Sequence, residues 1–160
     1  MKLKIALVVG SIAALAVPFV ASAGSPTDRA TGGGQVLLGT GAGNTIAFTA
    51  QGTPTDAKGQ VQVIDRSAGT GRNQVKFHGL VECIFVDGDM AEIAGVERDS
   101  GAAFTLRVVD NGEGANASGN DMIFFDDVAD DMRCASDGND GDDMQMALAR
   151  GNAQVYDAAP

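Results

Sequence analysis

Carboxylates are densest between residues 126 and 143, where eight aspartates stand against a single basic residue, Arg133. Oxygen-rich segments of this kind, with Gly and Asn among the acids, supply the ligands that Ca²⁺ needs, because six to eight oxygens must surround the ion. The candidate ligands, chosen for their near-alternate spacing, are Asp137, Asn139, Asp140 and Asp142. The chemistry that this segment indicates is calcium binding that stabilises the fold.

The spacing departs from the EF-hand calcium loop at two points. Gly141 stands where a third side-chain ligand is required, and no Glu occupies the twelfth position. The loop therefore does not preorganise a full coordination shell, and we expect weak affinity, in the ~10⁻⁴ to 10⁻³ M range of extracellular modules. The alternative interpretation is a solvated acidic loop without an ion.

His78 is the only histidine, and with Lys76 and Glu82 it lies on one face of a predicted strand, so a general acid–base pair is conceivable. Residues four apart on a strand are about 13 Å apart, too far for a direct hydrogen bond. Catalysis would need a cross-strand partner such as Asp65 or Glu92. The sequence contains no catalytic signature and favours a non-enzymatic function.

Cys83 and Cys134 are the only cysteines. In an oxidising compartment two such thiols usually pair, and a bridge closing roughly 50 residues would stabilise the fold by ~4 kcal/mol on the chain-entropy model. The alternative, a catalytic cysteine, would want a histidine beside it. His78 lies five residues earlier, which places it on the opposite face of the same strand.

The first 23 residues predict the compartment. Lys2 and Lys4 precede an apolar run from Ile5 to Val20, and Ala21-Ser22-Ala23 provides the small residues of a signal-peptidase site before Gly24. The run has 16 residues, whereas a transmembrane anchor needs about 18 or more. We therefore predict a signal peptide at 1–23, a secreted or periplasmic protein, and no membrane insertion after cleavage.

The predicted mature chain has 9 basic and 21 acidic residues, a formal charge of −12. A surface of this charge repels phosphate backbones and anionic headgroups. Nucleic acid is therefore not expected as a partner, and cations or basic and cell-surface partners are favoured. Solubility alone is the other explanation of the acidity.

Short β-branched and aromatic runs divided by Gly, Asn and Asp extend from Gly32 to Phe125, without a helical stripe. Ile46, Phe48 and Ala50 alternate with polar residues, as strand residues with one buried face do. The apolar faces also include Val61 and Val63; Val75, Phe77, Val81, Cys83 and Phe85; Phe104, Leu106 and Val108; and Met144, Met146 and Leu148. The run from Met144 to Ala149 also suits a short helix, and we favour a strand there. The sequence predicts an antiparallel meander of eight or nine strands, forming a small barrel or a two-sheet sandwich.

Turn residues punctuate this meander. Asp87-Gly88 and the segment from Asp110 to Asn120 are predicted hairpins, and Gly151-Asn152 is a predicted turn between two last strands. Gly79 in mid-strand predicts a bulge or bend. Gly32-Gly33-Gly34 lacks the lysine of a phosphate loop and is interpreted as a flexible lead into the first strand.

These signals divide the chain simply. After the leader we expect a flexible segment at 24–31 and a single all-β domain at 32–160, with an acidic insertion at 126–143. The 137 residues that remain after cleavage are enough for one core.

Five stretches together resemble the post-COAP type of small exported bacterial β-domain. They are Ala30 to Gly34, Ile46 to Phe48, Gly59 to Asp65, Val86 to Ala91, and Phe104 to Glu113 with its ending Asp110-Asn111-Gly112-Glu113. The resemblance implies a secreted all-β module and supplies no catalytic residues. The chain departs from it in lacking a Pro after Gly-Glu and in carrying the acidic, cysteine-bearing insertion.

Two functions follow from these observations. The first is a non-catalytic secreted or cell-surface module that acts by binding or by structural presence. The alternative is an enzyme or small-ligand carrier that uses the interior of a barrel. A core filled by Phe48, Phe77, Phe85, Phe104 and Phe124 would favour the first, and a large cavity with convergent polar groups the second.

Overall fold

The computed structural model describes residues 27–37, 43–66, 74–112, 120–126, 134 and 146–158. These residues form eight strands, without a helix: β1 (Asp28–Leu37), β2 (Gly43–Thr53), β3 (Asp56–Asp65), β4 (Val75–Asp87), β5 (Met90–Glu97), β6 (Ala103–Val109), β7 (Met122–Asp126) and β8 (Met146–Tyr156). No helix among them is long and apolar enough to cross a membrane. The predicted signal peptide and the four candidate calcium ligands lie outside the described residues.

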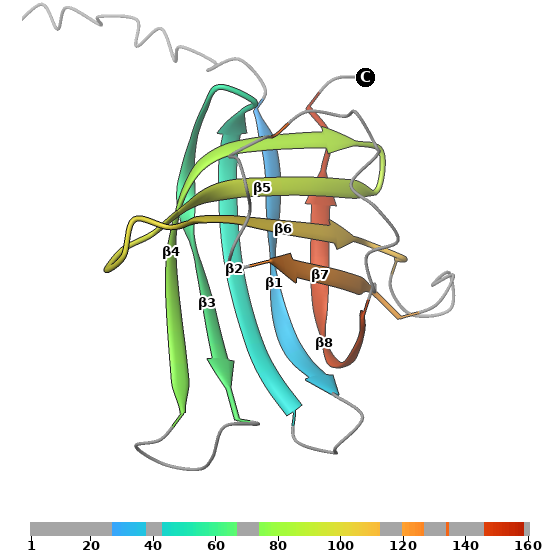
Figure 1. Ribbon diagram of the computed structural model, residues 1–160. Coiled ribbons are helices and arrows are strands. Elements are labelled where there is room, and N and C mark those ends of the chain that lie inside the picture. Colours follow the sequence, from blue (N-terminus) through green and yellow to red (C-terminus); the bar gives the residue numbers. More distant parts are fainter. Residues whose placement is uncertain are drawn as a thin grey trace, which may run out of the picture.

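Each strand pairs antiparallel with the next, and β1 pairs with β8, so the sheet closes into a barrel. The predictions of an antiparallel meander and a small barrel are confirmed. Figure 1 shows two layers. The strands β8, β1, β2, β3 and the first half of β4 lie along one axis, and β5, β6 and β7 cross that axis steeply. We call these the long layer and the cross layer.

The bend that joins the layers is a bulge in β4. Val81 pairs with Gly95 and Cys83 with Ala94, so Glu82 is an extra residue without a partner position on β5. A bulge bends a strand and increases its twist. In Figure 1 the first half of β4 accordingly runs along β3, and its second half turns across the barrel to run along β5.

The bulge also exchanges the two faces of β4. Phe77 and Val81 face the core before it, whereas Ile84 and Val86 face the core after it. The prediction that Cys83 and Phe85 share the core face with Phe77 and Val81 is therefore wrong, because an inserted residue reverses the alternation. The predicted irregularity exists, but at Glu82, three residues beyond Gly79.

A second irregularity lies in β8. Gln35 pairs with Arg150 and Val36 with Leu148, which leaves Ala149 as the extra residue. The predicted turn at Gly151-Asn152 is wrong, since β8 continues through it as one strand that pairs with β1 along nearly its whole length. The long partner strand stabilises an extended conformation that the local dipeptide alone does not favour.

Close backbone approach explains the glycines of β1. A Cβ on Gly32 would lie 2.8 Å from Ala153 Cα and 2.9 Å from Phe48 Cζ. The glycines therefore belong to a paired strand, so the interpretation of Gly32-Gly33-Gly34 as a flexible lead is wrong. This strand begins at Asp28, inside the segment 24–31 that we expected to be flexible. Absence of side chains lets β8 and the core rings pack closely at this place.

Apolar side chains from both layers fill the space between them. Phe77 packs edge-to-face against Phe104 and Phe125, with ring centroids 5.3 and 4.9 Å apart. Most predicted inward positions of the other strands are buried, namely Ile46, Phe48, Ala50, Val61, Phe104, Leu106, Val108 and Leu148, whereas Val63 and Met146 are half-buried against this core. Of the five predicted core phenylalanines, Phe48, Phe77 and Phe104 join this core, whereas Phe85 and Phe124 do not.

Both predicted hairpins are confirmed. Asp87 pairs with Met90 around Gly88-Asp89, and Gly88 has a φ of 62° while Asp89 does not have a positive φ. A glycine with positive φ at the first central position is the signature of a type II′ hairpin. β6 and β7 pair from Val109 and Met122 onward, as the hairpin at Asp110 to Asn120 requires.

Candidate functional site

The outer surface of the long layer carries an ordered array of polar side chains, which we call the polar face. It comprises the outward positions of five neighbouring strands, which the antiparallel register aligns in four rows. The rows are Lys58, Gln51, Arg29 and Tyr156; Leu80, Gln60, Thr49, Thr31 and Gln154; His78, Gln62, Ala47, Gly33 and Asn152; and Lys76, Ile64, Thr45, Gln35 and Arg150.

Alternation explains why these side chains point outward. Ala30, Phe48 and Val61 are buried in the core, so the residues between them on each strand face solvent. Most positions of the polar face are exposed, and the remainder are half-buried. Amides and hydroxyls predominate in the second row, where groups such as those of Gln60 and Thr49 can both donate and accept hydrogen bonds. The third row adds the amides of Gln62 and Asn152.

Charge on this face has a single sign. Of its nineteen positions four are cationic, namely Arg29, Lys58, Lys76 and Arg150, and none is a carboxylate. Two exposed carboxylates border the face, Asp56 two residues before Lys58 and Glu82 two residues after Leu80. None of the four forms an ion pair with another residue that the structure describes. The distribution is unexpected in a chain with 21 acidic and 11 basic residues.

A depression of about 540 Å³ lies at the end of the face near the β2–β3 turn. It is lined by Thr27, Thr49, Gln51, Gly52, Thr53, Asp56, Lys58 and Gly59. The amide of Gln51 donates to the Thr27 hydroxyl over 3.1 Å. The lining therefore offers hydroxyl groups, an amide, one ammonium and one carboxylate to a ligand.

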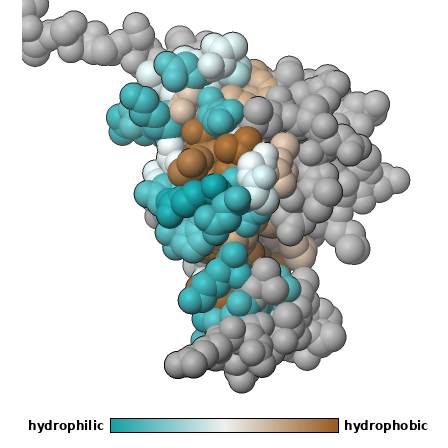
Figure 2. Space-filling model, turned by 60° about the vertical axis from the view of Figure 1, so that its left-hand side comes forward, coloured by the Kyte–Doolittle hydropathy of each residue, from teal (hydrophilic) through white to brown (hydrophobic). Residues whose placement is uncertain are grey.

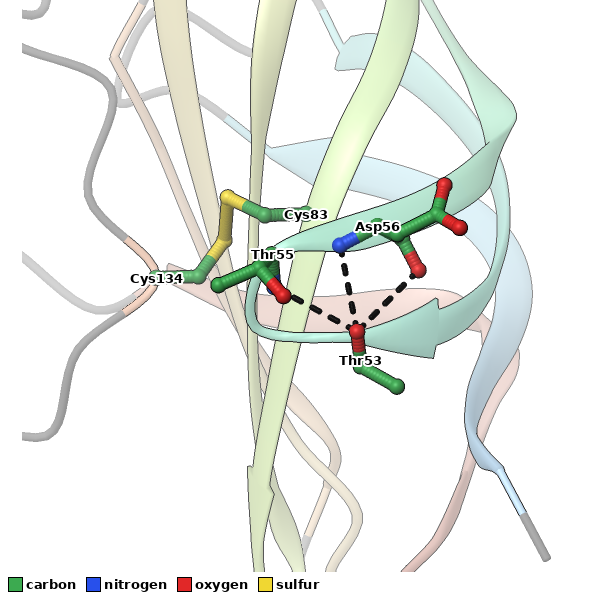
Figure 3. Close-up of a disulfide and its surroundings, with 5 residues drawn as sticks. All are labelled: Thr53, Thr55, Asp56, Cys83 and Cys134. Atoms are coloured by element: carbon green, nitrogen blue, oxygen red, sulfur yellow. Dashed lines mark hydrogen bonds between the residues drawn. A yellow bond between two sulfur atoms is a disulfide. The ribbon is translucent and has the colours of Figure 1, made fainter. Parts of the chain in front are cut away.

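The turn beside the depression is held by the Thr53 hydroxyl. It donates to the carbonyl of Asp56 over 3.3 Å and accepts from the backbone N–H groups of Thr55 and Asp56 at 3.4 and 3.1 Å (Figure 3). A side chain that satisfies several backbone groups in this way fixes a turn. The rim of the depression is consequently a structured hairpin.

Figure 2 brings forward the side that lies on the left of Figure 1, where β3 and β4 run. Among the coloured residues of this side hydrophilic ones predominate, and hydrophobic patches lie between them. The view agrees with the register, which places Lys58, Gln60 and Gln62 on the outer side of β3 and the exposed Leu80, 41% accessible, beside them.

The outer surface of the cross layer differs in chemistry. The predicted disulfide joins Cys83 on β4 to Cys134, with Cα atoms 5.9 Å apart (Figure 3). Both cysteines and Ala94 form a small buried cluster, separate from the main core, with Phe85 against it. The bridge therefore attaches the acidic insertion, at Cys134, to the outside of the barrel.

Beside this cluster an ion pair is almost fully covered. Arg107 Nη2 lies 3.5 Å from Glu92 Oε2, and the two side chains are 15% and 4% accessible. Register places Glu92, Arg107 and Phe124 in one row across β5, β6 and β7. Two buried charges that face each other are a structural pair, since leaving either alone would carry a large desolvation penalty.

The predicted acid–base partners are not brought together. His78 stands opposite Gln62 on the polar face, Asp65 opposite Val75 at the end of β3, and Glu92 opposite Phe85 on the cross layer. Register therefore separates both predicted partners from the imidazole. Among the described residues no group of three or more His, Cys, Asp or Glu side chains could hold a metal ion. The candidate calcium ligands lie outside those residues.

Our sequence reasoning missed the polar face, although a signal for it exists. From Arg29 to Lys76 the outward residues of the rows are mainly Thr, Gln, Lys and Arg, with Gly33, Ala47 and Ile64 among them, and the one carboxylate on this side is Asp56 at the start of β3. Alternation along one strand identifies its buried and its outward residues, but not which strands lie beside it. Assembling the face needs the strand order and register, which place Arg150 beside Gln35.

Comparison of the chain with protein-family models, curated proteins and solved structures identifies no match. The class that the fold defines is therefore a small antiparallel β-barrel with a filled core and a disulfide-tethered insertion.

Proposed function

We propose that this protein is an exported, non-catalytic binding module that holds a hydroxyl-rich ligand, a glycan chain, on the polar face of its barrel. The observation that carries the proposal is the array of outward amides and hydroxyls across five aligned strands. Sugar hydroxyls donate and accept hydrogen bonds, and Gln, Asn and Thr side chains do the same, so the two surfaces are chemically matched.

Two features of the face support a chain-like ligand. The rows continue across strands that lie about 4.8 Å apart, which gives an extended surface rather than an enclosed pocket. Tyr156, 59% accessible at one edge, offers an aromatic ring whose apolar body and hydroxyl suit the faces and edges of sugar rings. The depression near Thr53 adds a concave end where a chain terminus or branch would fit.

The filled, apolar interior of the barrel supports a ligand site on the outer surface. Side chains that would line a carrier cavity instead contact one another, as the rings of Phe77, Phe104 and Phe125 do. The enzyme or carrier alternative requires convergent polar groups inside, and the interior that the described strands enclose is apolar. We therefore place the ligand on the outer surface.

Export is part of the proposal. The leader at 1–23 supports it, and the Cys83–Cys134 bridge is compatible with an oxidising compartment outside the cytoplasm. The resemblance to the post-COAP type implies the same location. Calcium at Asp137, Asn139, Asp140 and Asp142 enters the proposal as a weak stabiliser of the insertion.

A panel of immobilised neutral and acidic polysaccharides tests the proposed function. We expect wild-type protein to be retained by at least one member, and the triple variant Thr31→Ala, Thr49→Ala, Gln60→Ala to lose retention. Asn120→Ala, an exposed amide outside the face, is the control and should bind as the parent does. A panel that retains no protein, or retains the triple variant equally, would overturn the proposal.

A further inference from the structure

The four cations of the polar face narrow the class of glycan. We infer that the ligand is an anionic polysaccharide, whose carboxylate or sulfate groups meet Arg29, Lys58, Lys76 and Arg150 while its hydroxyls meet the rows between them. This inference rests on the proposed function and adds the sign of the ligand's charge to it.

The arrangement of the cations matches a polymer with charges at intervals. Arg29 and Lys58 share the first row, and Lys76 and Arg150 share the fourth. From Arg29 to Gln35 is six residues along β1, so the two cationic rows are about 20 Å apart at ~3.4 Å per residue. Two uncharged hydrogen-bonding rows separate them. A ligand that satisfies this pattern carries its anionic groups apart, with neutral hydroxyls between.

The overall negative charge does not prevent such binding. At physiological ionic strength the screening length is about 8 Å, whereas the two layers of a barrel are themselves about 10 Å apart. A polymer in contact with the four rows therefore meets the four cations beneath it, and near the first row it also meets the exposed carboxylates of Asp56 and Glu82. The carboxylates of the cross layer, such as Glu92 and Asp126, act from beyond the screening length.

Other anionic partners fit the face less well. Nucleic acid binding relies on closely spaced phosphate contacts and aromatic stacking, and this face has four separated cations and one tyrosine. Peripheral membrane binding uses clustered basic residues together with inserted apolar side chains. Amides and hydroxyls such as Gln60, Thr49 and Gln154 instead suit the polar rings of a polysaccharide.

The test compares polygalacturonate with dextran as soluble polymers, by titration calorimetry in 0.15 M salt. We expect polygalacturonate to bind and dextran to bind at least tenfold more weakly. The quadruple variant Arg29→Gln, Lys58→Gln, Lys76→Gln, Arg150→Gln should weaken polygalacturonate binding by about tenfold or more, since each exposed pair contributes a fraction of a kcal/mol. Raising the salt to 1 M should abolish binding.

A pair of matched variants separates local from overall charge. Arg29→Gln with Lys58→Gln removes two positive charges from the face, and Asp87→Asn with Asp89→Asn removes two negative charges from the exposed β4–β5 turn. We expect the first pair to weaken binding severalfold and the second to change it less than twofold. Equal and opposite effects would overturn the inference, because they would mean that only net charge matters. If the quadruple variant folds poorly, the weakening of polygalacturonate binding is measured instead with the single variants Arg29→Gln and Lys76→Gln.

The remaining outcomes distinguish the inference from the function beneath it. Equal binding of dextran and polygalacturonate, lost in the Thr31, Thr49 and Gln60 triple variant, would overturn the anionic ligand and leave the proposed function standing. Polygalacturonate binding that both the quadruple and triple variants retain would show that the polar face is not the binding site. Tighter binding of duplex DNA or of anionic lipid vesicles than of polygalacturonate would overturn the polysaccharide class.

Discussion

Asp121 connects β7 to β8 through both its backbone and its side chain. Among the described residues β7 and β8 share two residue pairs, at Met122 and Ile123, and Leu148 N donates to the Asp121 carbonyl at 2.8 Å. The Asp121 carboxylate accepts hydrogen bonds from the N–H groups of Ala153 at 2.6 Å and Asn111 at 3.0 Å. A neighbouring carboxylate, that of Asp110, accepts from Val155 N at 3.1 Å. Side chains thus satisfy amides of β8 that the short strand β7 does not reach.

We predict that Asp121→Ala lowers the free energy of unfolding by about 2–4 kcal/mol, because it removes two charge-assisted hydrogen bonds and leaves the buried Ala153 N–H without its acceptor. Urea unfolding measures the change. Asp99→Ala, at an exposed turn, is the matched control and should change stability by less than ~0.5 kcal/mol. Equal stability of the two variants would mean that the Asp121 carboxylate does not stabilise the connection between β7 and β8.

Calcium gives a second prediction about individual residues. At millimolar Ca²⁺, near the expected dissociation constant, linkage adds at most about 1 kcal/mol of stability. We expect the thermal midpoint to rise slightly over that in chelator, and Asp140→Asn with Asp142→Asn together to remove the rise. An unchanged midpoint in the parent would favour the solvated-loop interpretation, and a rise that survives the double substitution would place the ion elsewhere.

At the scale of the strands, the close approach of β8 explains why β1 needs glycine at position 32. A methyl group on Gly32 would press against the backbone of β8 and the ring of Phe48, and a closely packed interior absorbs an added group poorly. We predict that Gly32→Ala destabilises the barrel by about 1–3 kcal/mol, as overpacking does. Chemical denaturation checks this, with the neighbouring exposed Thr31→Ala as control. A Gly32→Ala variant as stable as the parent would show that β1 can shift away from β8.

Strands were predictable where alternation runs unbroken. Ile46 to Ala50 and Phe104 to Val108 bury every second residue, as period-two patterning requires, and their apolar faces followed directly. Alternation fails at an inserted residue, because one extra position exchanges the faces of everything that follows. Glu82 and Ala149 have no side-chain type that marks them as bulges, and only pairing with β5 and β1 defines them.

The site residues that could be predicted from the sequence differ from the others in whether they depend on strand pairing. The Cys83–Cys134 bridge followed from counting thiols, which needs no geometry. The polar face needed the order of the strands, since Gln35 on β1 and Arg150 on β8 become neighbours only because β1 lies between β2 and β8. Local sequence patterns contain little information on pairing between residues that are more than a hundred positions apart.

At the scale of the whole molecule, the disulfide links the insertion to the barrel without entering the core. Its cysteines belong to the small outer cluster, and the main core contains neither. We predict that Cys83→Ser with Cys134→Ser lowers the free energy of unfolding by ~4 kcal/mol on the chain-entropy model and leaves the barrel folded. Far-ultraviolet circular dichroism and urea unfolding measure both effects, and intact mass with and without reductant establishes the bridge in the parent. Loss of β structure in the variant would show that the bridge is needed to fold.

Closure of the barrel by the first and last strands affects the order of folding. Arg29 pairs with Tyr156, so β1 lacks one neighbour until all the other strands and β8 itself have been synthesised. Contacts of such sequence separation form slowly, and an unpaired strand edge is a site of aggregation during that interval. Gly32, Gly33 and Gly34 give this waiting edge little apolar surface to present to other chains. The glycines that let β8 approach closely in the finished barrel therefore also protect the nascent chain before β8 exists.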